Sequence, residues 1–305
     1  MRMLLLGSAF AVFSTSLLAD DIAIETATGP VTVADTPKSI AVFDVAAIDT
    51  LNALGADVTG IPDKLYVSYL DAVLDTATVV GTLFEPNYET LAVMGPDLII
   101  IGGRSSTLSE PLAEIAPVID MTISNEAPSG DSIVAQGRAR IAAYGALLGK
   151  EDDAAALIAD LDAKIAEAQA AAEGRGNALI VLTNGAKISA FGATSRFGWL
   201  HDTVGIPVAA EGLDAETHGQ SISFEFIAET DPDWIFVVDR GAAIGQDGVA
   251  AAATLDNPLV NNTRAVQNGQ VVYLGSAPLY IAGGGATSMM TTLDEIIAAF
   301  TEQAG

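Results

Sequence analysis

Two stretches of the chain share one pattern: ETLAVMGPDLIIIGGR at residues 89–104 and EFIAETDPDWIFVVDR at residues 225–240. In each, glutamate comes first, alanine follows three residues later, and a Pro-Asp pair occupies the seventh and eighth steps. An apolar run then leads to arginine at the fifteenth step. The chain therefore contains an internal duplication, with one copy in each half.

Each copy predicts a short helix followed by a buried strand. A carboxylate suits the positive end of a helix dipole, so Glu89 and Glu225 are expected to open the helices. Proline cannot continue a helix, which puts Pro96 and Pro232 in the turns that follow. The unbroken apolar runs are typical of strands buried on both faces of a parallel sheet.

Arg104 and Arg240 come just after the carboxyl ends of these predicted strands. In open α/β sheets, ligands bind beyond those ends. Matching arginines in both copies therefore indicate one site shared by two lobes.

The segment between the copies predicts a long helix. Residues 151–172 read EDDAAALIADLDAKIAEAQAAA, with acidic residues first, alanine throughout, and the glycine-rich EGRGN afterwards. This pattern predicts one helix about 33 Å long. We expect an α/β protein with two Rossmann-like lobes, residues 20–150 and 174–305, joined by a single long rigid helix at 151–173. An ordinary helix packed within one lobe is the alternative, but it leaves the duplication unexplained.

The N-terminal residues and the composition indicate an exported protein. A positive start, an apolar run at residues 3–18 and Ala19 before a polar stretch describe a secretory signal peptide over residues 1–19. The chain has no cysteine, so it lacks the lipidated residue that anchors many exported proteins. Together these features favour the periplasm. The formal net charge of −26 makes nucleic acid and anionic membranes poor partners.

The sequence carries little catalytic chemistry. It has no G-x-S-x-G elbow, and GALLGKE at residues 145–151 departs from the spacing of a phosphate loop. GGGATS at 283–288 precedes a predicted helix and could hold an anion at its N-terminus, but it lacks the full dinucleotide pattern. Two histidines, His201 and His218, do not supply a zinc or manganese site. Nothing here favours an enzyme.

The chain resembles the periplasmic binding proteins of ABC importers that capture iron–siderophore complexes, in the branch that takes catecholate siderophores. The resemblance covers nearly all of the mature chain. It rests on the order and spacing of GTLFEPNYETLAVMGPDLIIIGGR, TNGAKISAFGATSRFGWL, THGQSISFEFIAETDPDWIFVVDR and LYIAGGG.

The resemblance implies a ligand cleft between two lobes and assigns roles to individual residues. Three arginines, Arg104, Arg196 and Arg240, would bind the siderophore. His218 of THGQ and Tyr280 of LYIAGGG would offer ligands directly to the iron. One glutamate on each lobe, here Glu89 and Glu225, would meet basic residues of the membrane permease.

The chemistry of these residue types suits such a ligand. Guanidinium groups bind delocalised oxygens of an anion in a fixed fork without losing their charge. Ferric iron favours oxygen donors, so a phenolate suits it and an imidazole is acceptable. A tetradentate bis-catecholate leaves two of six coordination positions open, which His218 and Tyr280 would fill. We therefore expect a monomer with no cofactor of its own, carrying Fe(III) as a siderophore complex.

Two other functions stay open at this point. A carrier for haem or a cobalamin-like ligand would share the fold without needing three clustered arginines. A metal-dependent hydrolase would use His218 and Tyr280 to hold a catalytic metal. The remaining expectations concern individual side chains: Lys64 edges the cleft, His201 is a packing or solvated residue, and Arg138, Arg140, Arg175 and Arg264 are solvated surface charges.

Overall fold

The computed structural model describes residues 21–33, 36–126, 132–213 and 219–302. Within them lie two five-stranded sheets, one in each half of the chain, and a two-stranded hairpin of β1 (Ile22–Thr26) and β2 (Gly29–Val33). The predicted signal peptide falls outside the described residues. None of the helices in the described part of the chain is long and apolar enough to span a membrane.

The first sheet is parallel throughout and has the order β5-β4-β3-β6-β7. Its strands are β3 (Ile40–Phe43), β4 (Gly60–Ile61), β5 (Thr78–Val79), β6 (Leu98–Ile101) and β7 (Val118–Asp120). Every residue of β3 and β6 is buried, as expected for strands covered on both faces.

The second sheet is mixed and has the order β10-β9-β8-β11-β12. Its strands are β8 (Ala178–Asn184), β9 (Lys187–Phe191), β10 (Gln220–Ser221), β11 (Trp234–Asp239) and β12 (Val271–Tyr273). β8, β11 and β12 are parallel to one another, whereas β9 pairs antiparallel with both of its neighbours, β8 and β10. The short link from β8 to β9, with Gly185 at a φ of 58°, allows only a hairpin.

The duplicated pattern folds as predicted. Its helices are α3 (Tyr88–Met94) and α8 (Phe224–Thr230), each capped by a side chain that accepts a backbone N–H. Asn87 caps the first and Ser223 the second, so both glutamates lie in the first turn. Gly95 and Asp231 end the helices in the left-handed region, and the proline and the buried strand follow.

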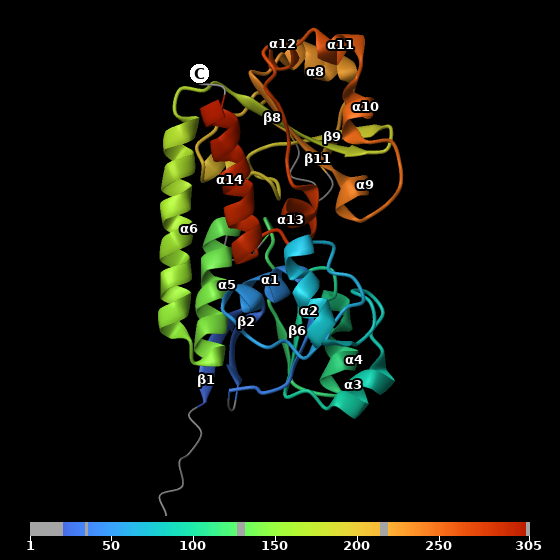
Figure 1. The fold of residues 1–305 in the computed structure, drawn as a ribbon, viewed down its shortest axis with the longest axis vertical. Helices are drawn as coiled ribbons and strands as arrows, with labels where there is room; N and C mark the ends of the chain where they lie inside the picture. Colours follow the sequence, from blue (N-terminus) through green and yellow to red (C-terminus); the bar gives the residue numbers. More distant parts are fainter. Residues whose placement is uncertain (1–20, 34–35, 127–131, 214–218, 303–305) are drawn as a thin grey trace, which may run out of the picture.

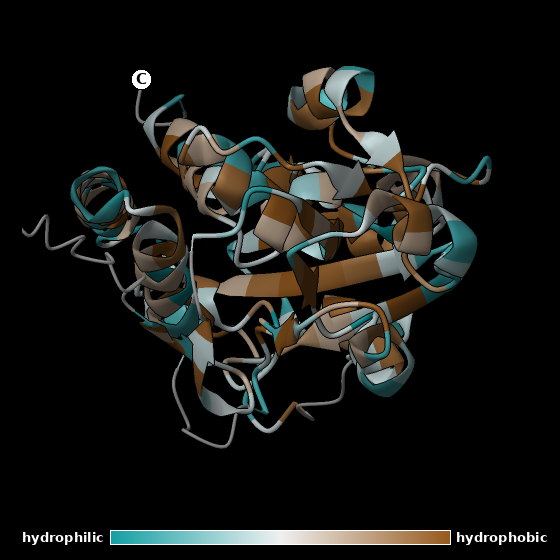
Figure 2. Ribbon diagram, turned by 90° about the horizontal axis from the view of Figure 1, so that it is seen from below, coloured by the Kyte–Doolittle hydropathy of each residue, from teal (hydrophilic) through white to brown (hydrophobic). Residues whose placement is uncertain are grey.

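Three helices form a layer along one side of the molecule. They are α5 (Ile133–Leu148), α6 (Glu151–Ala172) and α14 (Ala286–Glu302). In Figure 1, α6 runs the length of this side past both lobes, and α14 lies beside it. The buried face of α6 is a stripe of Ala154, Leu161, Ile165, Ala168 and Ala172. Figure 2 shows the apolar strands inside and the hydrophilic residues on the outer helices.

The fold is thus the expected pair of α/β lobes joined by a long helix, with α14 as an additional element packed against that helix. The remaining helices are short: α1 (Val45–Ala53), η1 (Ser68–Leu70), α2 (Asp71–Thr76), η2 (Ser106–Leu108), α4 (Ser109–Ala113), α7 (Trp199–Asp202), α9 (Arg240–Ala243), α10 (Ala251–Leu255), α11 (Pro258–Asn261), α12 (Arg264–Gln267) and α13 (Ser276–Ile281).

A buried carboxylate ties the first lobe to α14. The carboxylate of Asp49, on α1, accepts hydrogen bonds from the backbone N–H groups of Thr287 and Ser288 and from the Tyr69 hydroxyl. Gly285 makes room for it, because a Cβ there would lie 2.8 Å from the Asp49 Cγ. The N-terminus of α14, which follows the glycine run at residues 283–285, therefore binds the carboxylate of Asp49 rather than an external anion. Burial raises the pKa of Asp49 to about 6, although these hydrogen bonds oppose the rise.

Candidate functional site

The candidate site lies where the carboxyl ends of both sheets face each other. Arg104 follows β6 in the first lobe. Arg196 follows β9, Arg240 opens α9 directly after β11, and Tyr280 belongs to α13, all in the second lobe. Arg104 and Arg240 thus lie at the strand ends where open α/β sheets bind ligands, whereas Arg196 follows an antiparallel strand and does not obey that rule.

Three of the predicted arginines converge on Tyr280. Arg104 donates from Nη2 to the Tyr280 carbonyl oxygen at 2.7 Å and from Nη1 to that of Ile281 at 3.0 Å. Arg196 donates to the same Tyr280 carbonyl at 2.8 Å. Arg240 donates from Nε to the Tyr280 hydroxyl oxygen at 3.2 Å. Four of the five residues expected to bind ligand thus form one cluster.

The Tyr280 side chain also contacts two of these cations through its ring. The guanidinium carbon of Arg196 lies 4.6 Å from the ring centroid, and that of Arg104 lies 5.6 Å away. Such contacts stabilise a cation over the negative face of the ring. Tyr280 is itself buried, so its ring and carbonyl hold the arginines in place from within the protein.

The cluster concentrates positive charge in a place with little water. Burial lowers the pKa of Arg196 to about 10, and repulsion from Arg104 contributes to the shift. The last carbonyls of α13 offset part of this charge. An anion bound here would offset more of it, since the guanidinium groups would then have a charged acceptor.

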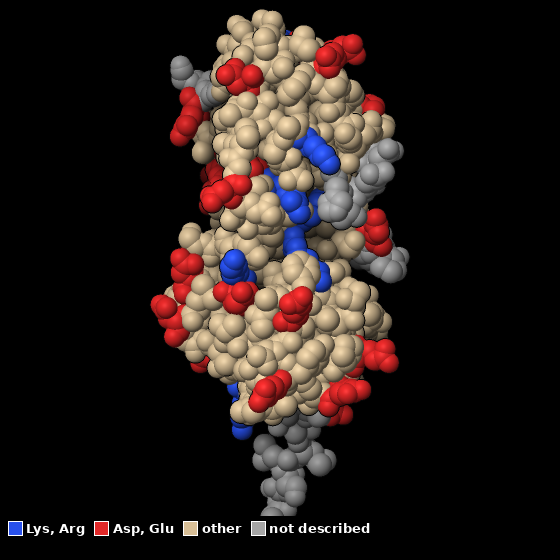
Figure 3. Space-filling view, turned by 90° about the vertical axis from the view of Figure 1, so that its right-hand side faces the viewer, with Lys and Arg blue, Asp and Glu red and all other residues tan. Residues whose placement is uncertain are grey.

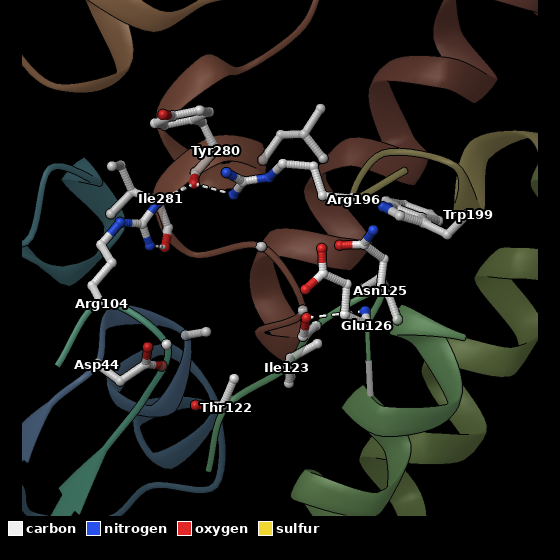
Figure 4. Close-up of a pocket in the computed structure, with 17 residues that line it drawn as sticks. Asp44, Arg104, Thr122, Ile123, Asn125, Glu126, Arg196, Trp199, Tyr280 and Ile281 are labelled. Carbon is white, nitrogen blue, oxygen red and sulfur yellow. Dashed lines mark hydrogen bonds between the residues drawn. The ribbon is translucent and has the colours of Figure 1, made fainter. Parts of the chain in front are cut away.

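A cavity of about 320 Å³ adjoins the cluster (Figure 4). Both lobes line it, with Arg104 and the segment after β7 on one side and Arg196, Trp199 and α13 on the other. Asp44, Asn125 and Glu126 also line it, and so do the following residues: Ala46, Gly103, Thr122, Ile123, Ser124, Ile133, Leu279, Tyr280, Ile281, Gly283 and Gly284.

The surface charge is distributed so that it favours an anion in the cleft. In Figure 3, Lys and Arg gather at the waist between the lobes, while Asp and Glu are scattered over the lobes themselves. The screening length at physiological salt is about 8 Å, so remote carboxylates weigh little beside the arginines. The net charge of −26 is therefore compatible with an anionic ligand.

Several predicted residues lie elsewhere. Glu89 and Glu225 are exposed in the first turns of α3 and α8, which lie toward opposite ends of the molecule (Figure 1). Lys64 is exposed and lines neither this cavity nor the cavity of about 500 Å³ on the far side of α13. His218 falls outside the described residues. His201 is buried, with Nδ1 2.8 Å from the Ile206 carbonyl oxygen, as expected of a packing residue.

The expectation that Arg140 is a solvated surface charge is wrong. Arg140 is buried, and its guanidinium donates to the backbone carbonyls of Glu25, Met121 and Thr122. Helix α5 packs against β1, which brings the Glu25 carbonyl to Arg140 from a distant part of the sequence. The helical pattern around Arg140 could not reveal this contact.

The structure adds Asp44, Asn125, Glu126 and Trp199 to the residues expected at the site. Asp44 lies just after β3, and Asn125 and Glu126 follow β7, so the rule that picked Arg104 could have found them. Trp199 opens α7, three residues after Arg196. Among the described residues, no cluster of three or more His, Cys, Asp or Glu side chains could hold a metal ion.

Two α/β lobes on a long helix, with an arginine-lined cavity between them, define a ligand-binding protein with an interlobe site. The chain belongs to the Periplasmic binding protein family, whose model matches residues 40–278. Members of this family are binding proteins of transporters rather than enzymes, which excludes the hydrolase alternative.

Individual relatives agree in both sequence and structure. The petrobactin-binding protein YclQ of Bacillus subtilis is 39% identical over 85% of this chain and 81% of its own length. Its crystal structure aligns with a TM-score of 0.85 over 92% of this chain and 99% of that one. The ferric-anguibactin-binding protein FatB of Vibrio anguillarum is 30% identical over 90% of this chain and 86% of its own. The catecholate-siderophore-binding protein VctP of Vibrio cholerae aligns at 28% identity with a TM-score of 0.84, covering 92% and 100%.

Proposed function

We propose that this protein captures a ferric catecholate siderophore, a tetradentate bis-catecholate, in the interlobe cavity and delivers it to an ABC permease for iron uptake. The observation that carries the proposal is the convergence of Arg104, Arg196 and Arg240 on Tyr280. A ferric catecholate is an anion rich in delocalised oxygens, and guanidinium groups are the side chains that bind such oxygens in pairs.

The similarity to YclQ, FatB and VctP supports the same ligand class, because the names of all three proteins state that they bind a siderophore. The ligand would enter as a complete ferric complex, so the protein needs no cofactor of its own. We propose that the side chains of His218 and Tyr280 coordinate the iron of that complex directly. The hydrogen bond that Arg240 donates to the Tyr280 hydroxyl oxygen supports this role, since it places that oxygen within the arginine cluster.

Delivery would depend on Glu89 and Glu225, one on each lobe. Their exposure and their equivalent places in α3 and α8 suit two symmetric contacts with basic residues of a permease. The lobes would comprise residues 20–150 and 174–305, with 151–173 as the connecting helix. The signal peptide expected at residues 1–19 and the family of the chain support a location in the periplasm, where we propose that the protein works as a monomer.

The test is a calorimetric titration of the purified protein with each of three iron complexes. They are a ferric tetradentate bis-catecholate, a ferric hydroxamate and haem. We expect the bis-catecholate to bind at least about 10-fold more tightly than the neutral hydroxamate complex, because only the anion gains from the guanidinium groups. Equal or tighter binding of the hydroxamate or of haem would contradict the proposal.

A further inference from the structure

Trp199 presents an unused hydrogen-bond donor to the cavity. The residue is only 4% exposed, yet its indole lines the cavity wall. The indole nitrogen is directed into the cavity beside Asn125 (Figure 4). None of the hydrogen bonds within the described part of the chain comes from this nitrogen, and it is not among the fully buried unpaired atoms there, so it stays open to the cavity. A donor that is fixed in a cavity wall and open to the cavity can bind a ligand that supplies the acceptor.

The chain's other tryptophan shows the contrast. Trp234 is 1% exposed in the core of the second lobe, and its indole N–H donates to the Arg175 carbonyl oxygen at 2.9 Å. It lines neither of the two cavities beside α13. The two indoles therefore differ in one respect that matters for binding: only that of Trp199 faces the cavity with its N–H unpaired.

Glu126 lines the same cavity, and its carboxylate points into it (Figure 4). In this view Glu126 and Trp199 lie on the side away from Arg104, whereas the guanidinium groups of Arg104 and Arg196 are turned toward Tyr280. Beside the Asn125 carboxamide, this side of the cavity thus offers a donor, the indole N–H, and an acceptor, the carboxylate. A carboxamide has the complementary pair, a carbonyl oxygen and an N–H.

We propose that Trp199 and Glu126 form a subsite that recognises a carboxamide in the arm of the ligand. Trp199 Nε1–H donates to the amide carbonyl oxygen, and Glu126 accepts from the amide N–H. This assignment rests on the proposed function, in which the arginines hold the chelate, and it narrows the ligand to catecholates attached through amide bonds.

The first test compares two ferric complexes on the Trp199→Phe variant, which keeps an aromatic ring and loses the donor. One probe is a bis-catecholamide, with two dihydroxybenzoyl groups joined to a diamine through amides, and the other is the bis complex of unsubstituted catechol. We expect binding of the catecholamide to weaken about 10-fold, as for loss of one hydrogen bond in a buried site. Binding of the catechol complex should change by no more than about 2-fold. Trp234→Phe, the matched control, should leave both affinities unchanged.

The second test observes the indole directly. Gallium(III) replaces iron(III) in the same complexes and is diamagnetic, so the two indole N–H signals can be followed by ¹H–¹⁵N NMR. We expect the Trp199 signal, assigned by its loss in Trp199→Phe, to move downfield with the catecholamide complex and to stay in place with the catechol complex. The Trp234 signal should move with neither.

Each outcome decides between the proposals. If the catecholamide binds but Trp199→Phe has no effect and the indole signal does not move, the subsite is wrong while the proposed function stands. If neither complex binds, the proposed function fails and the subsite fails with it.

Glu126→Gln keeps an acceptor oxygen, so we expect the affinity for the catecholamide complex to fall by no more than about 3-fold if the group at Glu126 is a neutral amide N–H. A loss of about 100-fold would indicate a cationic group at Glu126 and overturn the amide assignment.

Discussion

Arg104 of the first lobe donates to the backbone carbonyl oxygen of Tyr280 in the second, at 2.7 Å. A second hydrogen bond, from its other terminal nitrogen to Ile281, completes a fork across the interlobe cleft. One side chain therefore both lines the cavity and connects the lobes that enclose it. Because the guanidinium has five N–H groups, a bound anion can share it with these carbonyls.

The two parallel hydrogen bonds of Arg104 predict that a positive charge alone at position 104 does not preserve ligand affinity. Arg104→Lys keeps a cation but cannot donate in parallel to two acceptors, so we expect affinity for a ferric bis-catecholate to fall about 10-fold or more. Calorimetric titration measures this. Arg138→Lys is the matched control, because Arg138 pairs with Asp162 between α5 and α6 and lines neither cavity beside α13. Equal losses in the two variants would argue against a specific role for the Arg104 fork.

The exposed glutamates predict a separation of binding from delivery. In the double variant Glu89→Ala and Glu225→Ala, we expect the affinity of the purified protein to stay within about 2-fold of wild type, since neither residue lines the cavity. Uptake of a labelled ferric complex by cells that depend on this protein should be lost. Glu229→Ala, which removes an exposed carboxylate from the same helix as Glu225, should preserve uptake. A large loss of affinity in the double variant would show that these carboxylates shape the site instead.

A structural feature of this protein can be predicted from the sequence when the interactions that form it are between residues close together in the chain. The repeat predicts α3, β6, α8 and β11 because capping, turn chemistry and apolar runs are local. Arg104 and Arg240 follow from the same pattern, since the ends of parallel strands are where ligands bind. Arg196 and Tyr280 were expected only through the family resemblance.

The partners of these residues could not be predicted, because they come from distant parts of the chain. The carbonyl groups of α13 reach Arg104 only once the lobes are assembled, and Glu25 reaches Arg140 only through the hairpin that packs on α5. Whether the Trp199 indole N–H is paired likewise depends on tertiary packing. Such contacts have no periodic signature in the sequence.

The buried carboxylate of Asp49 predicts a particular pH dependence of stability. Its pKa is about 6 in the folded protein, compared with about 3.9 in an unfolded chain. Between these values the folded state holds the proton that the unfolded state has lost, so the contribution of Asp49 to stability falls as pH rises. The full loss, reached above pH 6, is about 3 kcal/mol.

Asp49→Asn isolates this contribution, because asparagine does not titrate. We expect the unfolding free energy of wild type minus that of the variant to decline between pH 4 and pH 7 by about 2 kcal/mol, since part of the full loss lies below pH 4. Urea denaturation followed by circular dichroism at several pH values measures the difference. Taking the difference removes the contribution of the other acidic residues, which is large for this net charge. A difference that stays constant with pH would mean that Asp49 is already ionised at pH 4.

Direct coordination of iron predicts that sensitivity to mutation depends on the denticity of the siderophore. Tyr280→Phe and His218→Ala should each weaken binding of a tetradentate ferric complex on the order of 10-fold, because each returns one coordination position to water. A hexadentate siderophore already saturates the iron, so its binding should change much less. Tyr280→Phe should also alter the visible charge-transfer band of the tetradentate complex, since a phenolate-to-iron transition is lost.

Arg196→Ala is the control: it should weaken binding of both complexes by similar factors, because a guanidinium responds to charge and not to coordination number. Titrations monitored by absorption measure affinity and spectrum together. If both substitutions leave the tetradentate complex unchanged in affinity and colour, the protein binds the siderophore through charge alone and supplies no ligand to the iron.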